Sequence, residues 1–389
     1  MITILLIIIY LAFISLGLPD AILGAAWPVA HIELGVTIGA AGLLSLVTTL
    51  GTIVSSLVSS RVIARFGTGK VTAFSVALTA AGLLGISFAP NVIFIVLMCV
   101  PLGLGAGAID TALNNFVALH YKAIHMSWLH CFWGVGASCG PVIMSCFLGT
   151  YGGWRKGYFT IAAIQIVLVA VMIFALPLWR LLEKEPAVQQ EKTEHIKIGR
   201  LLKIPGAVLA MFAFFCYCAA ELTCGMWGSS YFVQQRGATP EQAAQWVSFF
   251  YIGIMAGRFL AGLLTLKLKN KQLLYLGTAI AVAGGILLTL PLPLAVQPLA
   301  LLIVGLGCAP IFPSMIHNTP ILFGATYSQS IIGVQMASAY LGSTTLPPLF
   351  GVVAGKVGFW IYPVFILVML LVMFVTLVQL YRCTAVKEN

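Results

Sequence analysis

Charged residues are scarce in this sequence. Asp, Glu, Lys and Arg make up 8% of its 389 residues, and only 10 residues are acidic. An average soluble domain has about 25% charged residues. Hydrophobic residues reach 61% and the mean hydropathy is +1.06, more apolar surface than a soluble fold can bury. The shortage of charge therefore excludes an ordinary soluble protein and indicates an all-α, multi-pass membrane protein.

The sequence also lacks the motifs of catalysis. Its nine cysteines are scattered, without a CxxC pair and His at metal-ligand spacing. No Lys follows the glycine-rich run at P-loop spacing, and no nucleophile–base–acid set is evident. We therefore expect no enzyme, no bound metal and no cofactor. The net charge of +10 is explained by basic loops that fix orientation in a bilayer, so we expect a lipid partner and not nucleic acid.

Apolar runs of about 20 residues predict about twelve membrane-spanning helices. They cover residues 2–27, 38–60, 71–89, 92–119, 127–149, 158–180, 206–233, 244–265, 272–290, 295–318, 328–353 and 360–381. The only long polar stretch, 181–205, predicts a cytoplasmic linker. The predicted organisation is an N-terminal six-helix bundle (1–180), this linker, and a C-terminal six-helix bundle (206–389).

The two halves resemble each other at offsets of 197 to 202 residues. Matching pieces are Asp20-Ala-Ile-Leu-Gly24 with Glu221-Leu-Thr-Cys-Gly225, Arg61-Val-Ile-Ala with Arg258-Phe-Leu-Ala, and Gly103-Leu-Gly105 with Gly305-Leu-Gly307. Agreement of three regions indicates a duplication that yields two pseudo-symmetric bundles. In transporters built this way, the solute binds near the midplane between the halves.

The distribution of basic residues predicts the orientation. With the N-terminus inside, sixteen of the 20 Lys and Arg residues, Arg258 among them, lie in cytoplasmic segments or helix ends. Four lie on the opposite side: Arg155, Lys156, Arg236 and Lys356. We therefore expect a protein of the cytoplasmic membrane with both termini in the cytoplasm.

Three carboxylates, Asp20, Asp110 and Glu221, lie within apolar segments. A charge at the bilayer centre costs ~2.5 kcal/mol or more, so such a residue is by default functional and faces a polar cavity. A carboxyl group that alternates between dry and hydrated surroundings can take up and release a proton. These residues are candidates for proton coupling and solute binding, with Na⁺ as an alternative ion and a structural helix-capping role as the simpler explanation.

Further polar and aromatic side chains could line the same cavity. Asn114 is four residues after Asp110 and shares its helical face. Amides can both donate to and accept from sugar hydroxyls, although each could equally bond a neighbouring helix. The other candidates are Gln165, His317, Asn318 and Gln335, together with Trp133 as a stacking surface for a sugar ring. Trp154, Trp179 and Trp360 are expected to anchor the bilayer interface, and the glycines around Gly103 and Gly136 to permit close helix packing.

The chain resembles the major facilitator superfamily over essentially its full length. Ala64-Arg65-Phe66-Gly67-Thr68-Gly69-Lys70 is similar to that superfamily's signature loop, with Ala64 in place of the signature aspartate. Three stretches resemble the fucose–proton symporter group: Gly17–Pro28, Gly107–Asn114 and His130–Pro141. That group uses a carboxylate in helix 1 and one in helix 4 for sugar binding and proton coupling, and Asp20 and Asp110 match them.

The resemblance implies a monomeric secondary active symporter that moves a small polar solute, a monosaccharide, with protons by alternating access. One alternative stays open. The stretch from Gly136 to Pro141 is also similar to the helix 5 motif of drug–proton antiporters. The alternative function is therefore proton-coupled export of hydrophobic compounds. A transporter-like receptor without flux is a third, and the absence of a large soluble domain disfavours it.

Overall fold

The computed structural model describes residues 2–121, 123–182 and 198–385, and within these ranges it contains helices and no strand. The helices are α1 Ile2–Asp20, α2 Ile22–Glu33, α3 Ala40–Phe66, α4 Thr68–Ser87, α5 Val92–His120, α6 Ala123–Leu148, α7 Gly153–Leu182, α8 Ile198–Leu201, α9 Ala207–Arg236, α10 Pro240–Leu264, α11 Asn270–Thr289, α12 Gln297–Cys308, α13 Ile311–Phe323, α14 Ala325–Val357 and α15 Ile361–Ala385. Most of the expected linker, residues 183–197, lies outside the described residues.

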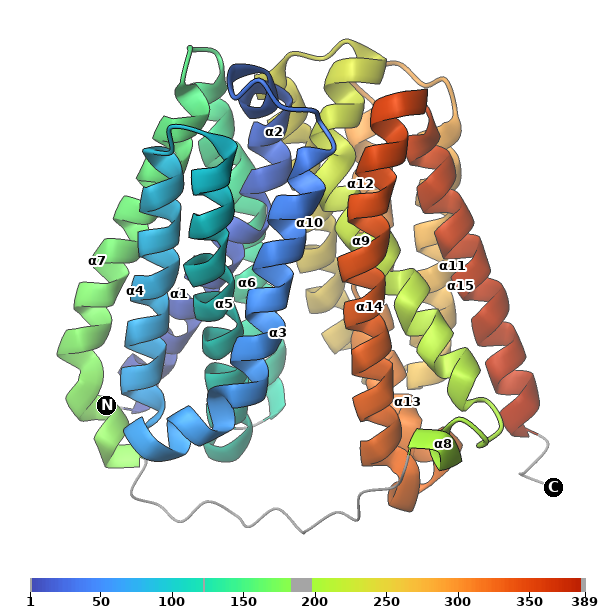
Figure 1. Ribbon diagram of the computed structural model, residues 1–389. Helices are drawn as coiled ribbons and strands as arrows, with labels where there is room; N and C mark the ends of the chain where they lie inside the picture. The colour runs from blue at the N-terminus through green and yellow to red at the C-terminus, as the bar shows by residue number, and fades with distance from the viewer. Residues whose placement is uncertain (1, 122, 183–197, 386–389) are drawn as a thin grey trace.

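Helices α1–α7 stand on one side of the molecule and α9–α15 on the other (Figure 1). The start of α1, the end of α7, α8 and the end of α15 lie at one end, which we call the linker end; the other is the far end. The two sides meet at the far end, where Gly42 of α3 lies against Pro348 of α14 and Gly24 of α2 against Gly225 of α9. Toward the linker end they diverge, and α5 and α13 are not packed together in the described residues.

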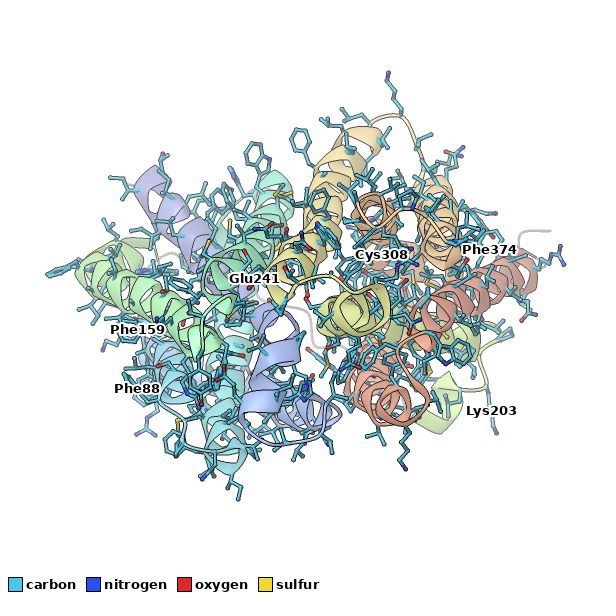
Figure 2. All side chains as sticks on the ribbon, turned by 90° about the horizontal axis from the view of Figure 1, so that it is seen from above. Phe88, Phe159, Lys203, Glu241, Cys308 and Phe374 are labelled. Atoms are coloured by element: carbon cyan, nitrogen blue, oxygen red, sulfur yellow. The ribbon has the colours of Figure 1, made fainter. Side chains whose placement is uncertain are left out.

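The view from above shows how the two sides join along one seam (Figure 2). Glu241, at the start of α10, lies near the centre of this view, and its carboxyl group is next to Gly149 at the end of α6. Phe88 and Phe159 lie together at the edge, with ring centroids 6.1 Å apart. Helices α6 and α10 therefore form a contact between the sides that begins at the far end.

Hydropathy and length agree with a membrane-spanning fold. Among the described residues, eleven helical stretches are long and apolar enough to cross a membrane. The remaining expected span corresponds to α14, whose 33 residues include many Ser, Thr and Gly. The architecture is thus consistent with the predicted twelve-helix fold.

Two of the spans are broken, and the first break places a candidate site residue. Pro19 has no N–H, so it cannot donate to the carbonyl of Ser15 one turn earlier. Gln165 of α7 donates its Nε2 to that Ser15 oxygen at 2.8 Å, while Thr79 donates to Gln165 Oε1 at 2.8 Å. Helix α1 then ends at Asp20. The second break separates α12 from α13 at Ala309 and Pro310.

Glycines allow the close approach of helices that the sequence predicts. A Cβ at Gly103 or Gly107 of α5 would collide with the carbonyl oxygens of Thr48 and Thr52 of α3. The same helix pair is joined by a hydrogen bond from Thr52 Oγ1 to the Gly103 carbonyl, 3.3 Å long. Close packing at these glycines is therefore confirmed, and it keeps α5 and its Asp110 against α3.

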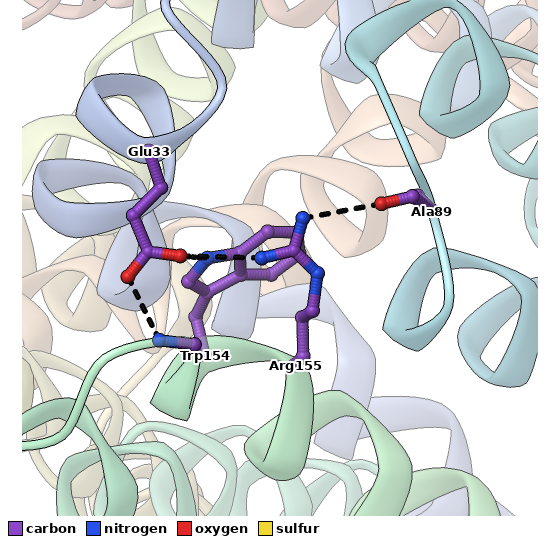
Figure 3. A network of polar contacts seen from close by, with 5 residues as sticks. Glu33, Ala89, Trp154 and Arg155 are labelled. Carbon is purple, nitrogen blue, oxygen red and sulfur yellow. Dashed lines mark hydrogen bonds and ion pairs between the residues drawn. The ribbon is translucent and has the colours of Figure 1, made fainter.

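A polar cluster joins three parts of the first side at its far end (Figure 3). Glu33 at the end of α2 accepts hydrogen bonds from Trp154 Nε1 at 2.8 Å, from Arg155 at 3.2 Å and from the Gly152 amide at 2.9 Å. Arg155 also donates to the carbonyl of Ala89, between α4 and α5, at 3.2 Å. The cluster joins α2, α7 and the α4–α5 turn.

The sequence predicts Trp154, Trp179 and Trp360 at the bilayer interface, and the structure differs from this prediction for two of them. Trp154 and Trp179 are each only 1% exposed, so the expectation is wrong for both. The Arg155 guanidinium covers the Trp154 ring at 4.1 Å, and Glu33 accepts the indole N–H. These partners hold Trp154 inside the protein, whereas Trp179 packs against the ring of Phe116, with ring centroids 4.7 Å apart. Trp360, at 55% exposed, is accessible as an interfacial ring would be.

Candidate functional site

Asp20 is held at the point where the first span is interrupted. Trp133 of α6 donates its indole N–H to Asp20 Oδ2 at 2.7 Å. This distance is at the short end of the usual range for N–H···O hydrogen bonds. The Asp20 side chain nevertheless stays exposed, because the helix ends beside it. Asp20 is therefore fixed in direction and still open to a solute or an ion.

Asp110 lies in the middle of α5 and is half-buried. Asn114 donates its amide Nδ2 to Asp110 Oδ1 and to the Asp110 carbonyl oxygen, both at 2.9 Å. The prediction that these two residues share a helical face is confirmed. Asp110 is also close enough to Asp20 for their charges to interact, so α1 and α5 bring two acids together.

Glu221 of α9 is the acid of the other side. It is half-buried, and the hydroxyl of Tyr217, one turn earlier on α9, lies beside it. Arg258 of α10 is near enough to interact with its charge. The described residues nevertheless contain a single ion pair, between Glu33 and Arg155, so Glu221 and Arg258 are not in direct contact.

Arg258 lies between the two sides of the molecule. The sequence places it at the cytoplasmic end of its span, whereas the structure places its guanidinium against α6. Its carbon Cζ is 4.9 Å from the centroid of the Trp133 ring, and its NH1 donates to the carbonyl oxygen of His130 at 3.2 Å. Arg258 lies six residues before the end of α10, so its expected place near a helix end is not contradicted. The direction of its side chain was not predicted, because a count of basic residues does not consider the aromatic and carbonyl partners that it reaches.

Two tyrosines complete the arrangement. The ring of Tyr251 on α10 stands edge-on to Trp133, with centroids 6.3 Å apart, and Tyr251 is within electrostatic range of both Asp20 and Glu221. Tyr340 of α14 is within range of Asp110. We call the connected set the central polar group; it consists of Asp20, Asp110, Asn114, His130, Trp133, Tyr217, Glu221, Tyr251, Arg258 and Tyr340.

The central polar group can recognise a small polyhydroxylated molecule. Its carboxylates accept hydrogen bonds, its amide and guanidinium donate them, and its tyrosine hydroxyls do both. Aromatic faces offer a surface for the apolar side of a sugar ring. Within the described residues, no three of His, Cys, Asp and Glu lie together as metal ligands would. The carboxylates of the group can in addition take up a proton or a cation.

Four of the predicted binding residues lie elsewhere. Gln165 is fully buried and bonded to Ser15 and Thr79, so it joins helices of the first side. His317 and Asn318 lie on α13, exposed and buried respectively, and Gln335 of α14 accepts a hydrogen bond from Thr319 of α13 at 2.9 Å. The contacts among described residues do not connect these side chains to the central polar group.

The sequence did not single out Tyr217, Tyr251, Arg258 or Tyr340. A tyrosine in an apolar segment is usually part of the core, and Tyr217 and Tyr251 are indeed buried. The available signal was Arg258, a guanidinium inside an otherwise apolar stretch from Val247 to Leu264. An ionisable residue at that position has the same functional expectation as the three acids.

Comparison with known proteins identifies relatives over most of the chain. The family model described as "Major Facilitator Superfamily" matches residues 9–344. "Bypass of stop codon protein 6" of Saccharomyces cerevisiae is 23% identical over 384 residues, covering 90% of this chain and 77% of that protein. "Glucose/mannose transporter GlcP" of Bacillus subtilis is 25% identical over 272 residues, covering 66% of this chain and 65% of that protein.

Solved structures with the same fold cover nearly the whole chain. A D-xylose-proton symporter superposes with a TM-score of 0.71 over 96% of this chain and 97% of its own, at 14% sequence identity. A bacterial homolog of the human lysosomal transporter Spinster, in an inward-facing and occupied conformation, superposes with a TM-score of 0.69 over 98% of this chain and 95% of its own, also at 14% identity. At this identity the likeness establishes the fold.

Proposed function

The chain belongs to the Major Facilitator Superfamily, and from that premise we propose that it is a proton-coupled symporter of a monosaccharide. The chain is a membrane transporter and not an enzyme. The finer proposal concerns the solute and the coupling ion. It assigns the central polar group to both: hydroxyls of the solute bind its carboxylates and amide, and a carboxyl group carries the proton.

The observation that carries the proposal is the balance of charge in the central polar group. Asp20 and Asp110 are close enough for their charges to interact, and Tyr251 is within range of both Asp20 and Glu221. The Arg258 guanidinium is within range of one of the three acids, Glu221. Like charges in surroundings of low dielectric oppose one another, so such a group favours uptake of a cation. A proton needs no further ligands, whereas Na⁺ would need several oxygens, and we therefore favour the proton.

The solute class is supported by the chemistry of the group and by relatives. Carboxylates, an amide and aromatic rings together suit a ring with several hydroxyls. A relative is named as a glucose and mannose transporter, and a protein of the same fold is a D-xylose-proton symporter. We extend their solute class to this chain on the strength of Asp20, Asn114 and Trp133.

Alternating access gives the mechanism. The positive-inside rule places the linker end in the cytoplasm, so this conformation would load or release its solute there. Binding a solute and a proton at the junction of the two sides lowers the cost of closing over them, and opening at the far end exposes the same site to the other side. The proposed unit of transport is one monomer in the cytoplasmic membrane.

Counterflow in proteoliposomes tests the proposal. Labelled monosaccharides are offered to vesicles preloaded with the unlabelled sugar, and proton and sodium gradients are varied separately. We expect counterflow with one or a few hexoses or pentoses, and accumulation that follows the proton gradient. Accumulation that follows only sodium would replace the ion, and the absence of counterflow with any monosaccharide would refute the solute class.

Asp110→Asn separates coupling from transport. The amide keeps the shape of the side chain and can still bond Asn114, but it cannot carry a proton. A membrane potential of 100 mV supplies about 2.3 kcal/mol per charge, enough for roughly 40-fold accumulation with one proton. We expect the variant to equilibrate its sugar at a ratio of about 1 while counterflow continues. Parent-like accumulation by Asp110→Asn would refute the role of this residue.

Export of hydrophobic compounds is the second candidate, and its basis is the stretch from Gly136 to Pro141. A Cβ at Gly136 or Gly140 would collide with the backbone of α1 at Ile14 or Leu18. These glycines therefore have a packing role that requires no drug substrate. A resistance assay with toxic dyes distinguishes the two functions: resistance conferred by the parent, combined with no sugar counterflow, would favour export.

A further inference from the structure

Arg258 connects the second side of the molecule to the first, close to the central acids. It belongs to α10, in the second side, but its guanidinium contacts α6 of the first side, at the His130 carbonyl and the Trp133 ring. A guanidinium is planar and weakly hydrated, so it can stack on an aromatic face and donate a hydrogen bond at the same time.

The same tryptophan contacts a proposed solute-binding residue. Its indole N–H donates to Asp20 Oδ2 at 2.7 Å, while its ring face carries Arg258. One rigid ring thus connects α1, α6 and α10. A change at Asp20 that frees the indole N–H permits the ring to turn, and a turned ring no longer presents its face to the guanidinium.

Arg258 has a second potential partner in its own half. Glu221 of α9 is within electrostatic range without forming an ion pair in this conformation. A guanidinium released from Trp133 and His130 would therefore be drawn to Glu221. The two positions of Arg258 differ in one respect that matters: the first connects the two sides of the molecule, and the second lies within one side.

We propose that Arg258 and Trp133 form a latch across the two sides that stabilises the conformation open at the linker end and is released when Asp20 exchanges the indole for a solute. Arg258 is a positioning residue in this scheme, since it acts through Trp133. The inference rests on the alternating-access part of the proposed function. It does not depend on the solute being a sugar or on the ion being a proton.

Distance measurements between spin labels test the latch without any solute. Leu119 of α5 and Ile321 of α13 are exposed near the linker end, and cysteines at these positions report its opening. The exposed native cysteines are replaced by serine; they are Cys139, Cys146 and Cys383. Pulsed electron paramagnetic resonance in lipid nanodiscs then gives the populations of long and short distances.

Arg258→Gln should lower the ratio of the long to the short distance roughly ten-fold, a change that corresponds to about 1.4 kcal/mol, within the range of a partly desolvated cation–π contact. Arg61→Gln is the matched control, because Arg61 occupies the corresponding position of the first repeat but is exposed. We expect the control to keep the distribution of the parent.

Two further variants keep the inference falsifiable. Arg258→Lys retains the positive charge but loses the planar guanidinium, so it should give a distance distribution between those of the parent and Arg258→Gln. It also serves as the test variant if Arg258→Gln does not fold. Trp133→Phe keeps a ring but loses the donor to Asp20, so the ring can turn and the long distance should lose population even without any solute. A distribution like that of the parent would contradict the role of this hydrogen bond in the latch.

Parent-like distances in Arg258→Gln or, if that variant does not fold, in Arg258→Lys would overturn the latch, even if counterflow were impaired. That combination would place Arg258 in solute or ion binding alone. The proposed function fails by a different result, the absence of sugar counterflow in the parent, so the two failures can be told apart.

Discussion

Closure of the far end depends on a contact between backbones, and Gly24 is the residue to perturb. A Cβ built on Gly24 of α2 lies 2.5 Å from the carbonyl oxygen of Met226 and 2.6 Å from that of Gly225, both on α9. An ordinary contact begins at 3.4 Å, and a backbone oxygen inside a helix cannot rotate away. Gly24→Ala must therefore push α2 and α9 apart at the place where the two sides meet.

The size of the effect follows from the cost of overpacking. Inserting a methyl group into a packed contact typically costs 1–3 kcal/mol, so we expect the far-end-closed conformation to lose roughly 5- to 150-fold in population relative to far-end-open states. Labels on Ile32 and Val296, both exposed near the far end, should report a longer distance in Gly24→Ala. Counterflow should slow, because each cycle passes through the closed state.

The control for this variant is another glycine in a helix. Gly262 of α10 has no atom within 4 Å of a built Cβ, so Gly262→Ala adds the same methyl group into open space. Both substitutions change helix propensity equally, which leaves the collision with α9 as the difference. If Gly24→Ala showed the far-end distances and the counterflow of Gly262→Ala, the reasoning that backbone contact closes this end would be refuted.

Two further predictions concern stability. Glu33→Gln weakens the hydrogen bonds that Glu33 accepts from Arg155 and Trp154, and should lower the free energy of unfolding by about 1–3 kcal/mol. The thermal unfolding midpoint in detergent should fall while counterflow stays intact. An unchanged midpoint would contradict the role of the cluster. Gln165→Leu leaves the Ser15 carbonyl without its donor, so it should lower the free energy of unfolding by a similar amount and leave the KM for the solute unchanged. A raised KM at parent stability would instead place Gln165 in the binding site.

The helical fold could be predicted from the sequence because the features that determine it are local along the chain. Apolar length, basic loop residues and turn residues each act locally, and they predict spans that correspond to the observed helices. The break after Pro19 is partly readable, since proline removes a donor. The hydrogen bond from Gln165 to the Ser15 carbonyl cannot be read from the sequence. The two residues lie 150 positions apart, and any buried amide could have been the donor.

The candidate site was predictable where charge in an apolar segment identified it. Asp20, Asp110 and Glu221 could be selected because a charged side chain in an apolar segment costs free energy in the bilayer. Asn114 could be selected because it lies one helical turn after Asp110. The structure brings these residues into one group. The partner of Trp133 could be established only from the three-dimensional contact. Arg258 was counted among the cytoplasmic segments and helix ends, and its contact with the opposite side could not be predicted from that count. The spacing of residues along one helix does not reveal which other helix its side chains will contact.

The broken symmetry of the repeat explains why the two sides can perform different tasks. The repeat matches Asp20 with Glu221 and Arg61 with Arg258, yet Arg61 is exposed while Arg258 contacts the opposite side. The first side therefore contributes two acids and the second an acid with a cation. An acid pair changes its charge when a proton binds, whereas a guanidinium does not titrate and can only change its partner. In the proposed mechanism, the acid pair of the first side binds the ion, and the guanidinium of the second side keeps its charge and changes its partner. Together these two responses would couple ion binding to the relative position of the two sides.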